Sequence, residues 1–198
     1  MEIEVRFRGR TACLFLLAAA CVSGAYPAEQ RTFILEKADR SLLCAYTSER
    51  EWAQVPKDKD IEFTARVDSG DGVVTAVLVE RFTEDTTTYD EYTVARDGNV
   101  LRLKRTLDVI PERVTREQVW NIRGGWPVKV SESWMELRTH KPRGPDEDLG
   151  DLVANPIMVR ISDFPFYSLM TDKHPERWPG GTRCVSGDMN KLEAIPAK

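Results

Sequence analysis

The stretch from residue 61 to residue 137 constrains the fold most, because apolar and polar side chains alternate there with a period of two. Ile61, Phe63, Ala65 and Val67 alternate with Glu62, Thr64 and Arg66. Turn sequences interrupt the alternation at Asp68–Gly72, Asp97–Asn99 and Gly124–Gly125. Alternation of this kind is typical of half-buried strands, and a Gly-Gly pair between two strands is typical of a tight hairpin. The stretch therefore predicts six consecutive antiparallel strands, a β meander.

A meander of this length has to protect its edge strands by closing, by curling, or by packing a helix over one face. We therefore expect a mainly β fold whose antiparallel meander forms a strongly curved sheet or a small barrel. The segment 29–55 is expected to cover one opening or face. Within it, Glu29 to Arg40 has helical spacing of apolar residues, and Ser48 to Glu51 opens a short helix that carries Trp52. Leu42 to Tyr46 is too short to assign.

The chain beyond residue 140 contains more loop signals than strand signals. Lys141 to Asp151 combines two prolines, two glycines and four acidic residues, and predicts an exposed loop. Pro156 to Ile161 predicts a seventh strand. Further prolines and a Gly-Gly pair predict an irregular C-terminal tail that Cys184 joins to the body.

The first 25 residues have the order of a secretory signal peptide. Arg6, Arg8 and Arg10 precede an uncharged stretch from Thr11 to Val22, and small residues end at Ala25. An uncharged core of this length is too short to span a bilayer. We expect cleavage after Ala25 and a single β domain over residues 26–198. The alternative is an apolar first helix of the fold.

A second route of processing competes with this cleavage. Leu17-Ala18-Ala19-Ala20-Cys21 loosely resembles a bacterial lipoprotein box, in which Cys21 is acylated and becomes the new N-terminus. A lipid on Cys21 would tether the domain to a membrane without making it span the bilayer. The expected location is exported: bacterial periplasm, envelope or the secreted fraction.

Two cysteines, Cys44 and Cys184, lie outside the predicted signal peptide. In an oxidising compartment an even pair predicts a disulfide, and this one would close a loop of about 140 residues. The alternative is two separately buried thiols.

Composition and motifs exclude several classes of function. With 28 basic and 32 acidic side chains, the net charge of -4 gives no bulk attraction to nucleic acid. No closely spaced Cys or His pair predicts a metal site, and the acidic run from Asp146 to Asp151 fails the calcium-loop pattern. The two histidines, His140 and His174, lie near no nucleophile motif, and no phosphate loop occurs. We therefore expect neither cofactor nor metal.

Arg105 is the residue most out of place in the pattern. It shares the parity of Leu101, Leu103 and Leu107, which directs a permanent charge toward the apolar side of the sheet. One interpretation is an internal ion pair with a residue such as Glu91 or Glu132. The other is a cavity in which Arg105 fixes the anionic group of a ligand.

The tryptophans permit two interpretations of the same kind. Trp120 falls on the face of Gln118 and Ile122, while Trp126 and Trp134 share the parity of Val128 and Val130. Trp120 and Trp134 are candidate ligand-binding residues beside Arg105; core packing is the alternative.

The sequence thus supports three hypotheses. The first is an exported, non-enzymatic β domain that binds an apolar or amphiphilic small molecule, or a protein partner, in or beside its curved sheet. The second is an exported hydrolase with paired carboxylates, drawn from strand residues such as Glu80, Glu91 and Glu132. The third is a structural lipoprotein of the envelope.

Overall fold

One ten-stranded antiparallel sheet forms the body of the protein. The computed structural model describes residues 30–39, 41–56, 60–145, 155–172 and 177–186. Its elements, in chain order, are β1 (Gln30–Lys37), β2 (Leu42–Tyr46), α1 (Glu49–Trp52), β3 (Ile61–Gly70), β4 (Val73–Phe82), β5 (Thr86–Val94), β6 (Val100–Val109), β7 (Val114–Arg123), β8 (Trp126–Glu136), β9 (Pro142–Arg143), the 3-10 turn η2 (Ile161–Asp163), α2 (Tyr167–Met170), the 3-10 turn η4 (Pro179–Gly181) and β10 (Thr182–Ser186). The strand order is β10-β2-β1-β3-β4-β5-β6-β7-β8-β9.

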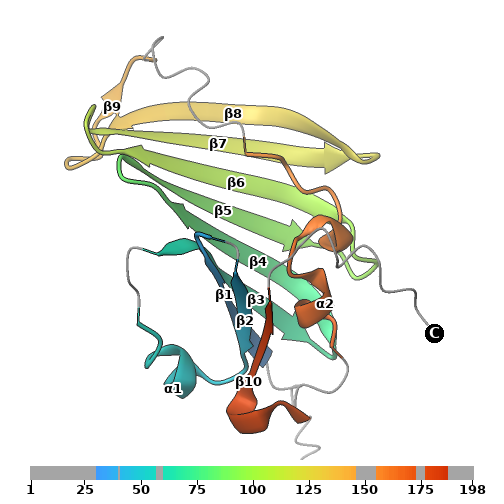
Figure 1. Cartoon of the computed structure of the whole chain (residues 1–198). Coiled ribbons are helices and arrows are strands. Elements are labelled where there is room, and N and C mark those ends of the chain that lie inside the picture. Colours follow the sequence, from blue (N-terminus) through green and yellow to red (C-terminus); the bar gives the residue numbers. More distant parts are fainter. Residues whose placement is uncertain (1–29, 40, 57–59, 146–154, 173–176, 187–198) are drawn as a thin grey trace, which may run out of the picture.

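The predicted meander is confirmed. Residues 61–137 form β3 to β8, and each strand pairs with the next through a short turn. Gly124 and Gly125 have φ angles of 58° and 81°, the left-handed conformations that a two-residue hairpin turn requires. β9 and β10 end the described sheet on opposite sides, so the sheet is curved and open rather than closed into a barrel. Figure 1 shows how far the strand direction rotates between β8 and β2.

The helix expected from Glu29 to Arg40 is wrong, because this segment forms strand β1 in the interior of the sheet. β1 pairs with β2 on one side and with β3 on the other. Its side chains are buried on both faces, from Thr32 to Glu36, so the apolar run lacks the alternation that marks a half-buried strand. The short helix α1 does begin after Ser48 as expected, and β2 takes up the segment left unassigned.

The strand expected over Pro156 to Ile161 is also wrong. Arg160 makes only an isolated bridge with Asn99, and η2 follows at once. The backbone of Val100 donates to Val159 O at 2.9 Å, and that of Ile161 donates to Gly98 O at 2.9 Å. These bonds hold the segment across the β5–β6 turn, and Pro156 at its start has no backbone N–H to contribute to a regular ladder.

The sheet has two unlike faces, which we call inner and outer. The inner face carries the main core, because residues 155–172 and Trp178 pack on it, whereas α1 packs on the outer face at the β1–β2 side. Phe164 contacts Tyr92 edge to face at 4.9 Å, and Phe166 packs on Phe63 at 5.5 Å. On the outer face, Trp52 of α1 stacks on Phe33 at 5.4 Å. Residues 155–172 and Trp178, which we call the C-terminal segment, therefore provide most of the cover that was expected from segment 29–55.

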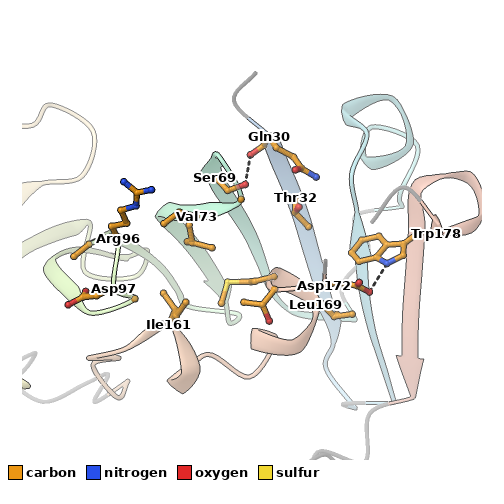
Figure 2. A pocket seen from close by; sticks show the side chains of 16 residues that line it. Gln30, Thr32, Ser69, Val73, Arg96, Asp97, Ile161, Leu169, Asp172 and Trp178 are labelled. Carbon is orange, nitrogen blue, oxygen red and sulfur yellow. Dashed lines mark hydrogen bonds between the residues drawn. The ribbon is translucent and has the colours of Figure 1, made fainter. Parts of the chain in front are cut away.

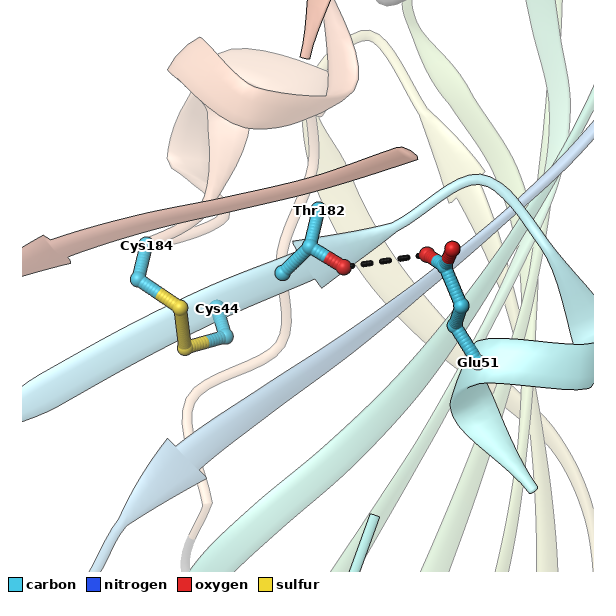
Figure 3. Close-up of a disulfide and its surroundings, with 4 residues drawn as sticks. All are labelled: Cys44, Glu51, Thr182 and Cys184. Atoms are coloured by element: carbon cyan, nitrogen blue, oxygen red, sulfur yellow. Dashed lines mark hydrogen bonds between the residues drawn. A yellow bond between two sulfur atoms is a disulfide. The ribbon is translucent and has the colours of Figure 1, made fainter. Parts of the chain in front are cut away.

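The predicted disulfide is confirmed. Cys44 of β2 and Cys184 of β10 lie directly opposite each other in register, with their Cα atoms 4.1 Å apart and their sulfurs bonded (Figure 3). Beside it, Thr182 donates to Glu51 of α1 at 3.1 Å. The disulfide joins β10, the last described strand, to β2, and it is compatible with an oxidising, exported location.

Several expectations fall outside the described residues. These are the signal peptide over residues 1–25, the lipidation site Cys21, the acidic run from Asp146 to Asp151, and His174. Among the helices that the structure describes, none has both the length and the apolar character needed to cross a membrane.

Candidate ligand-binding site

A cavity of about 510 Å³ lies between the inner face of the sheet and the C-terminal segment (Figure 2). Its volume is within the range of about 300–1,000 Å³ that is usual for small-molecule sites. β1, the β3–β4 turn and the β5–β6 turn form the sheet side, while η2, α2 and Trp178 form the cover. The lining residues are Gln30, Thr32, Ser69, Gly72, Val73, Val74, Ala95, Arg96, Asp97, Gly98, Ile161, Leu169, Met170, Thr171, Asp172 and Trp178.

The middle of the cavity is apolar. Val73 and Val74 begin β4, and Ile161, Leu169 and Met170 face them from the cover. Leu169 is only 3% exposed, because Phe166, one helical turn before it, is anchored in the core. The short α2 is therefore positioned by its aromatic neighbour rather than by its own length. A ligand that occupies this region meets mainly hydrocarbon.

Trp178 forms one end of the cover and is fixed by polar contacts. Its indole N–H donates to Asp172 at 3.0 Å, and Asp172 also forms an ion pair with Arg183 of β10. The ion pair connects this end of the cover to β10, and β10 is joined to β2 by strand pairing and by the disulfide.

Thr32 is the buried polar group of the cavity. It lies on the inner face of β1 and is 9% exposed. Within the described part of the chain its hydroxyl makes no hydrogen bond, although it lines the cavity. An unpaired hydroxyl in such a position costs free energy unless a ligand or water bonds to it.

Arg96 and Asp97 stand at the other end, on the β5–β6 turn. Both carboxylate oxygens of Asp97 accept hydrogen bonds from Asn99, at 3.0 Å from the backbone and 2.7 Å from the side chain. These bonds lower the pKa of Asp97, so the group stays ionised. Among the described residues, no hydrogen bond or ion pair holds the guanidinium of Arg96.

Arg105 is buried as its parity predicts, and Asp90 is its partner. Arg105 Nε donates to Asp90 Oδ1 at 2.6 Å, and its Nη2 donates to Oδ2 at 2.8 Å. Its Nη1 donates to the backbone oxygen of Asn155 at 3.0 Å. Of the two interpretations, the internal ion pair describes these contacts, but neither Glu91 nor Glu132 takes part. Arg105 does not line the cavity.

The charge of this pair is stabilised locally. Burial acts against the charged form of Arg105, but the hydrogen bonds and the charge of Asp90 outweigh it and raise the pKa of the arginine. Arg81 also donates to Asp90 at 3.2 Å. Burial, and then the charge of Asp90, raises the pKa of Tyr92, so the phenol stays neutral.

Leu101 departs from the face expected for it. A β-bulge pairs Thr93 with Arg102 but Val94 with Val100, which leaves Leu101 without a partner on β5. Leu101 is accordingly 49% exposed, while Val100 is buried in its place.

The two predicted tryptophans lie on the inner face but outside the cavity. Trp120 packs against the main core, 5.7 Å from the guanidinium carbon of Arg105. Trp134 belongs to a second buried cluster with Leu107, Val109 and Val114, where Arg116 lies over its ring at 4.9 Å. The structure thus brings Arg105 and Trp120 together and keeps Trp134 apart from them. Trp126, which shares the sequence parity of Trp134, is 76% exposed.

The candidate carboxylates of the hydrolase hypothesis are divided between the two faces. Glu80 and Glu91 lie on the outer face of β4 and β5, where Glu80 accepts a hydrogen bond from Thr64 at 3.0 Å. Glu132 lies on the inner face, in register with Gln118. Burial opposes its charge, but hydrogen bonds from Lys129, Arg116 and Gln118 prevail and lower the pKa of Glu132 to about 2. It is therefore unsuited to donate a proton near neutral pH.

Sequence reasoning missed the residues that line the cavity. The sequence patterns place Thr32 in a helix and Leu169 and Met170 in an irregular tail, and they give Arg96 no role. No local pattern marks them, because the cavity exists only once the C-terminal segment covers the sheet. Across the described ranges no group of three His, Cys, Asp or Glu side chains is arranged to hold a metal ion.

Comparison of the chain with protein-family models, with curated proteins and with solved structures finds no match.

Proposed function

We propose that this domain binds a small amphiphilic molecule in the cavity between its inner face and the C-terminal segment. The observation that carries the proposal is a cavity of about 510 Å³ with an apolar middle and polar residues around it. Small-molecule sites usually combine apolar and aromatic side chains with polar groups that fix the orientation of the ligand.

Two further observations support binding rather than packing alone. The hydroxyl of Thr32 faces the cavity without a hydrogen bond to the described residues, although the residue is only 9% exposed. The cover is also held by the disulfide and by the Asp172 contacts, so the space is maintained by the fold. A preformed site loses little entropy when it is filled.

The proposal includes an oxidising location, since the disulfide is stable there. The bacterial periplasm, the envelope or the secreted fraction fits, with lipidation at Cys21 as the route that would keep the domain at a membrane. Localisation of the full chain, and mass spectrometry of its mature N-terminus, test this part.

The binding proposal is tested with the uncharged fluorophore N-phenyl-1-naphthylamine, whose emission rises in apolar surroundings. We expect saturable binding to the oxidised protein. Met170→Trp places a larger side chain in the cavity and should weaken binding by at least about tenfold, since a filled site excludes the probe.

Ile110→Trp is the matched control, because Ile110 is 54% exposed on the β6–β7 turn, at the far end of the strands. Its probe binding should equal that of the unmodified protein. Binding that is not saturable, or that Met170→Trp leaves unchanged while the variant stays folded, contradicts the proposed function.

A further inference from the structure

We infer that the ligand is an elongated anion, a chain acid whose carboxylate lies at Arg96 and whose far end carries a hydroxyl or similar polar group that bonds to Thr32. This inference rests on the proposed function and specifies the chemistry of the same site. It derives from three observations: a free cation at one end, an unpaired hydroxyl at the other, and hydrocarbon between them.

The first observation is the state of Arg96. The other charged lining groups already have partners, because Asp97 is bonded to Asn99 and Asp172 to Trp178 and Arg183. Arg96 is an exposed residue at the rim of the cavity, and among the described charged residues that line the cavity it alone has unused hydrogen-bond donors. A guanidinium of this kind binds a carboxylate through short, charge-assisted hydrogen bonds.

Asp97, the neighbouring carboxylate, makes directional hydrogen bonding more important than net charge at this turn. Asp97 is adjacent to Arg96 and remains ionised, so the local net charge of the turn is zero without a ligand. Both the attraction of an anion to Arg96 and its repulsion from Asp97 grow with the charge of the anion. A carboxylate is therefore held mainly by the paired N–H donors of the guanidinium, whose spacing matches its two oxygens.

The second observation is the hydroxyl of Thr32. It lies on β1, three strand positions from β5, whose end leads into Arg96. With strands about 4.8 Å apart, the separation across the strands alone is roughly 14 Å. Arg96 also lies four residues past Tyr92, the β5 residue in register with Thr32, so a chain of at least about ten carbons is needed to join the two groups. A polar group at the end of such a chain reaches Thr32, which both donates and accepts.

The third observation is what lies between the two ends. Val73, Ile161 and Met170 line the space that the chain crosses, and Figure 2 shows Val73 and Ile161 between Arg96 on one side and Thr32 on the other. Methylene groups gain free energy from burial against these side chains. Arg96 and Thr32 therefore determine which polar groups the ligand carries at its two ends, while the apolar residues between them contribute binding affinity.

The inference is tested by calorimetry with decanol, decanoate and 10-hydroxydecanoate. We expect decanoate to bind about tenfold more tightly than decanol, and the hydroxy acid to bind more tightly still. Arg96→Gln should remove the preference for decanoate over decanol. Arg102→Gln, an exposed arginine of β6 outside the cavity, is the matched control and should keep it.

Thr32→Val tests the other end. It replaces the hydroxyl by a methyl group of similar size, so the advantage of the hydroxy acid over decanoate should disappear while decanoate binding stays the same. The ligand-free variant should unfold at the same urea concentration as the unmodified protein or slightly higher, because no hydrogen bond is lost.

The outcomes separate the two proposals. If none of the three compounds nor the naphthylamine probe binds, the proposed function is wrong. If decanol and decanoate bind equally and Arg96→Gln changes neither affinity, the cavity binds amphiphiles but the assignment of the anion to Arg96 is overturned. If Thr32→Val leaves the affinity for the hydroxy acid unchanged, the assignment of the far end is overturned.

Discussion

Asp90 is fully buried and accepts hydrogen bonds from two arginines, Arg105 and Arg81. It begins a row of polar side chains that crosses the inner face in register: Asp90 on β5, Arg105 on β6, Gln118 on β7 and Glu132 on β8. The row separates the main core from the second cluster around Trp134. Each charge in it is compensated by the neighbouring strand.

Replacing the carboxylate should cost more than replacing the arginine. Asp90→Asn leaves two arginines without their partner, and we expect a loss of about 3–5 kcal/mol in the free energy of unfolding. Arg105→Met leaves Asp90 bonded to Arg81 and should cost less, about 1–3 kcal/mol. Urea denaturation measures both.

Glu91→Gln is the control for this comparison, since Glu91 is the exposed neighbour of Asp90. Its effect should stay within about 0.5 kcal/mol. Equal losses for Asp90→Asn and Arg105→Met would show that Arg81 contributes nothing to the cluster.

Glu132 makes stability depend on pH in the acid range. Its folded-state pKa of about 2 lies below the ordinary value of 4.5, so its contribution is complete above pH 4.5 and is lost as the pH falls toward 2. The group is partly exposed to solvent, so the contribution is about 1 kcal/mol after screening. Thermal unfolding of Glu132→Gln should show a deficit at pH 7 that shrinks toward pH 2. A deficit that is constant with pH would mean that the ion pairs are not its source.

Parity along β6 was enough to predict that Arg105 is buried and needs an anion. It was not enough to identify the anion. That choice depends on the register between β5 and β6, which the turn at Asp97–Asn99 and the bulge at Leu101 set together. Without the bulge, the register of Val94 with Val100 would continue and place Tyr89, not Asp90, opposite Arg105. The partner therefore depends on a backbone irregularity that parity alone does not show.

At the scale of elements, β10 depends on the disulfide more than any other described strand does. It is five residues long, pairs with β2 alone, and is joined to the rest of the sheet at Cys184. The bond closes a loop with a sequence separation of 140 residues. Cross-links of such long loops constrain the unfolded chain strongly.

The double variant Cys44→Ala/Cys184→Ala should therefore lose about 4 kcal/mol of stability in urea denaturation. The unmodified protein, reduced with dithiothreitol, should lose the same amount. Oxidised and reduced forms that unfold at equal urea concentrations would contradict this expectation.

The same scale shows why half-buried strands were predicted and β1 was not. In β3 and β6 one face meets solvent, so polar and apolar residues alternate. In β1 both faces are covered, by the C-terminal segment and by Trp52, and the alternation disappears. Alternation of polar and apolar residues therefore indicates a strand only where one face of that strand is exposed to solvent.

At the scale of the whole molecule, the sheet was predictable and its cover was not. Turns and alternation are local, and they determined six strands in the correct order. The cover consists of short turns whose positions depend on aromatic side chains, Phe164 and Phe166, that contact residues about 70 to 100 positions earlier. The cavity lies between sheet and cover, so no local pattern could have indicated it.

The position of β10 beside β2 has a consequence for synthesis of the chain. β2 is the second strand to be made and β10 is the last of the described strands, so the β2 edge stays unpaired until the rest of the sheet has been translated. The inner face likewise stays uncovered until residues 155–172 and Trp178 have left the ribosome. Contacts between β10 and β2, and between the cover and the inner face, cannot form until both partners have been synthesised. Pairing at the β2 edge and burial of the inner face therefore wait for the last described residues, whereas the hairpins from β3 to β8 need only their neighbours in sequence.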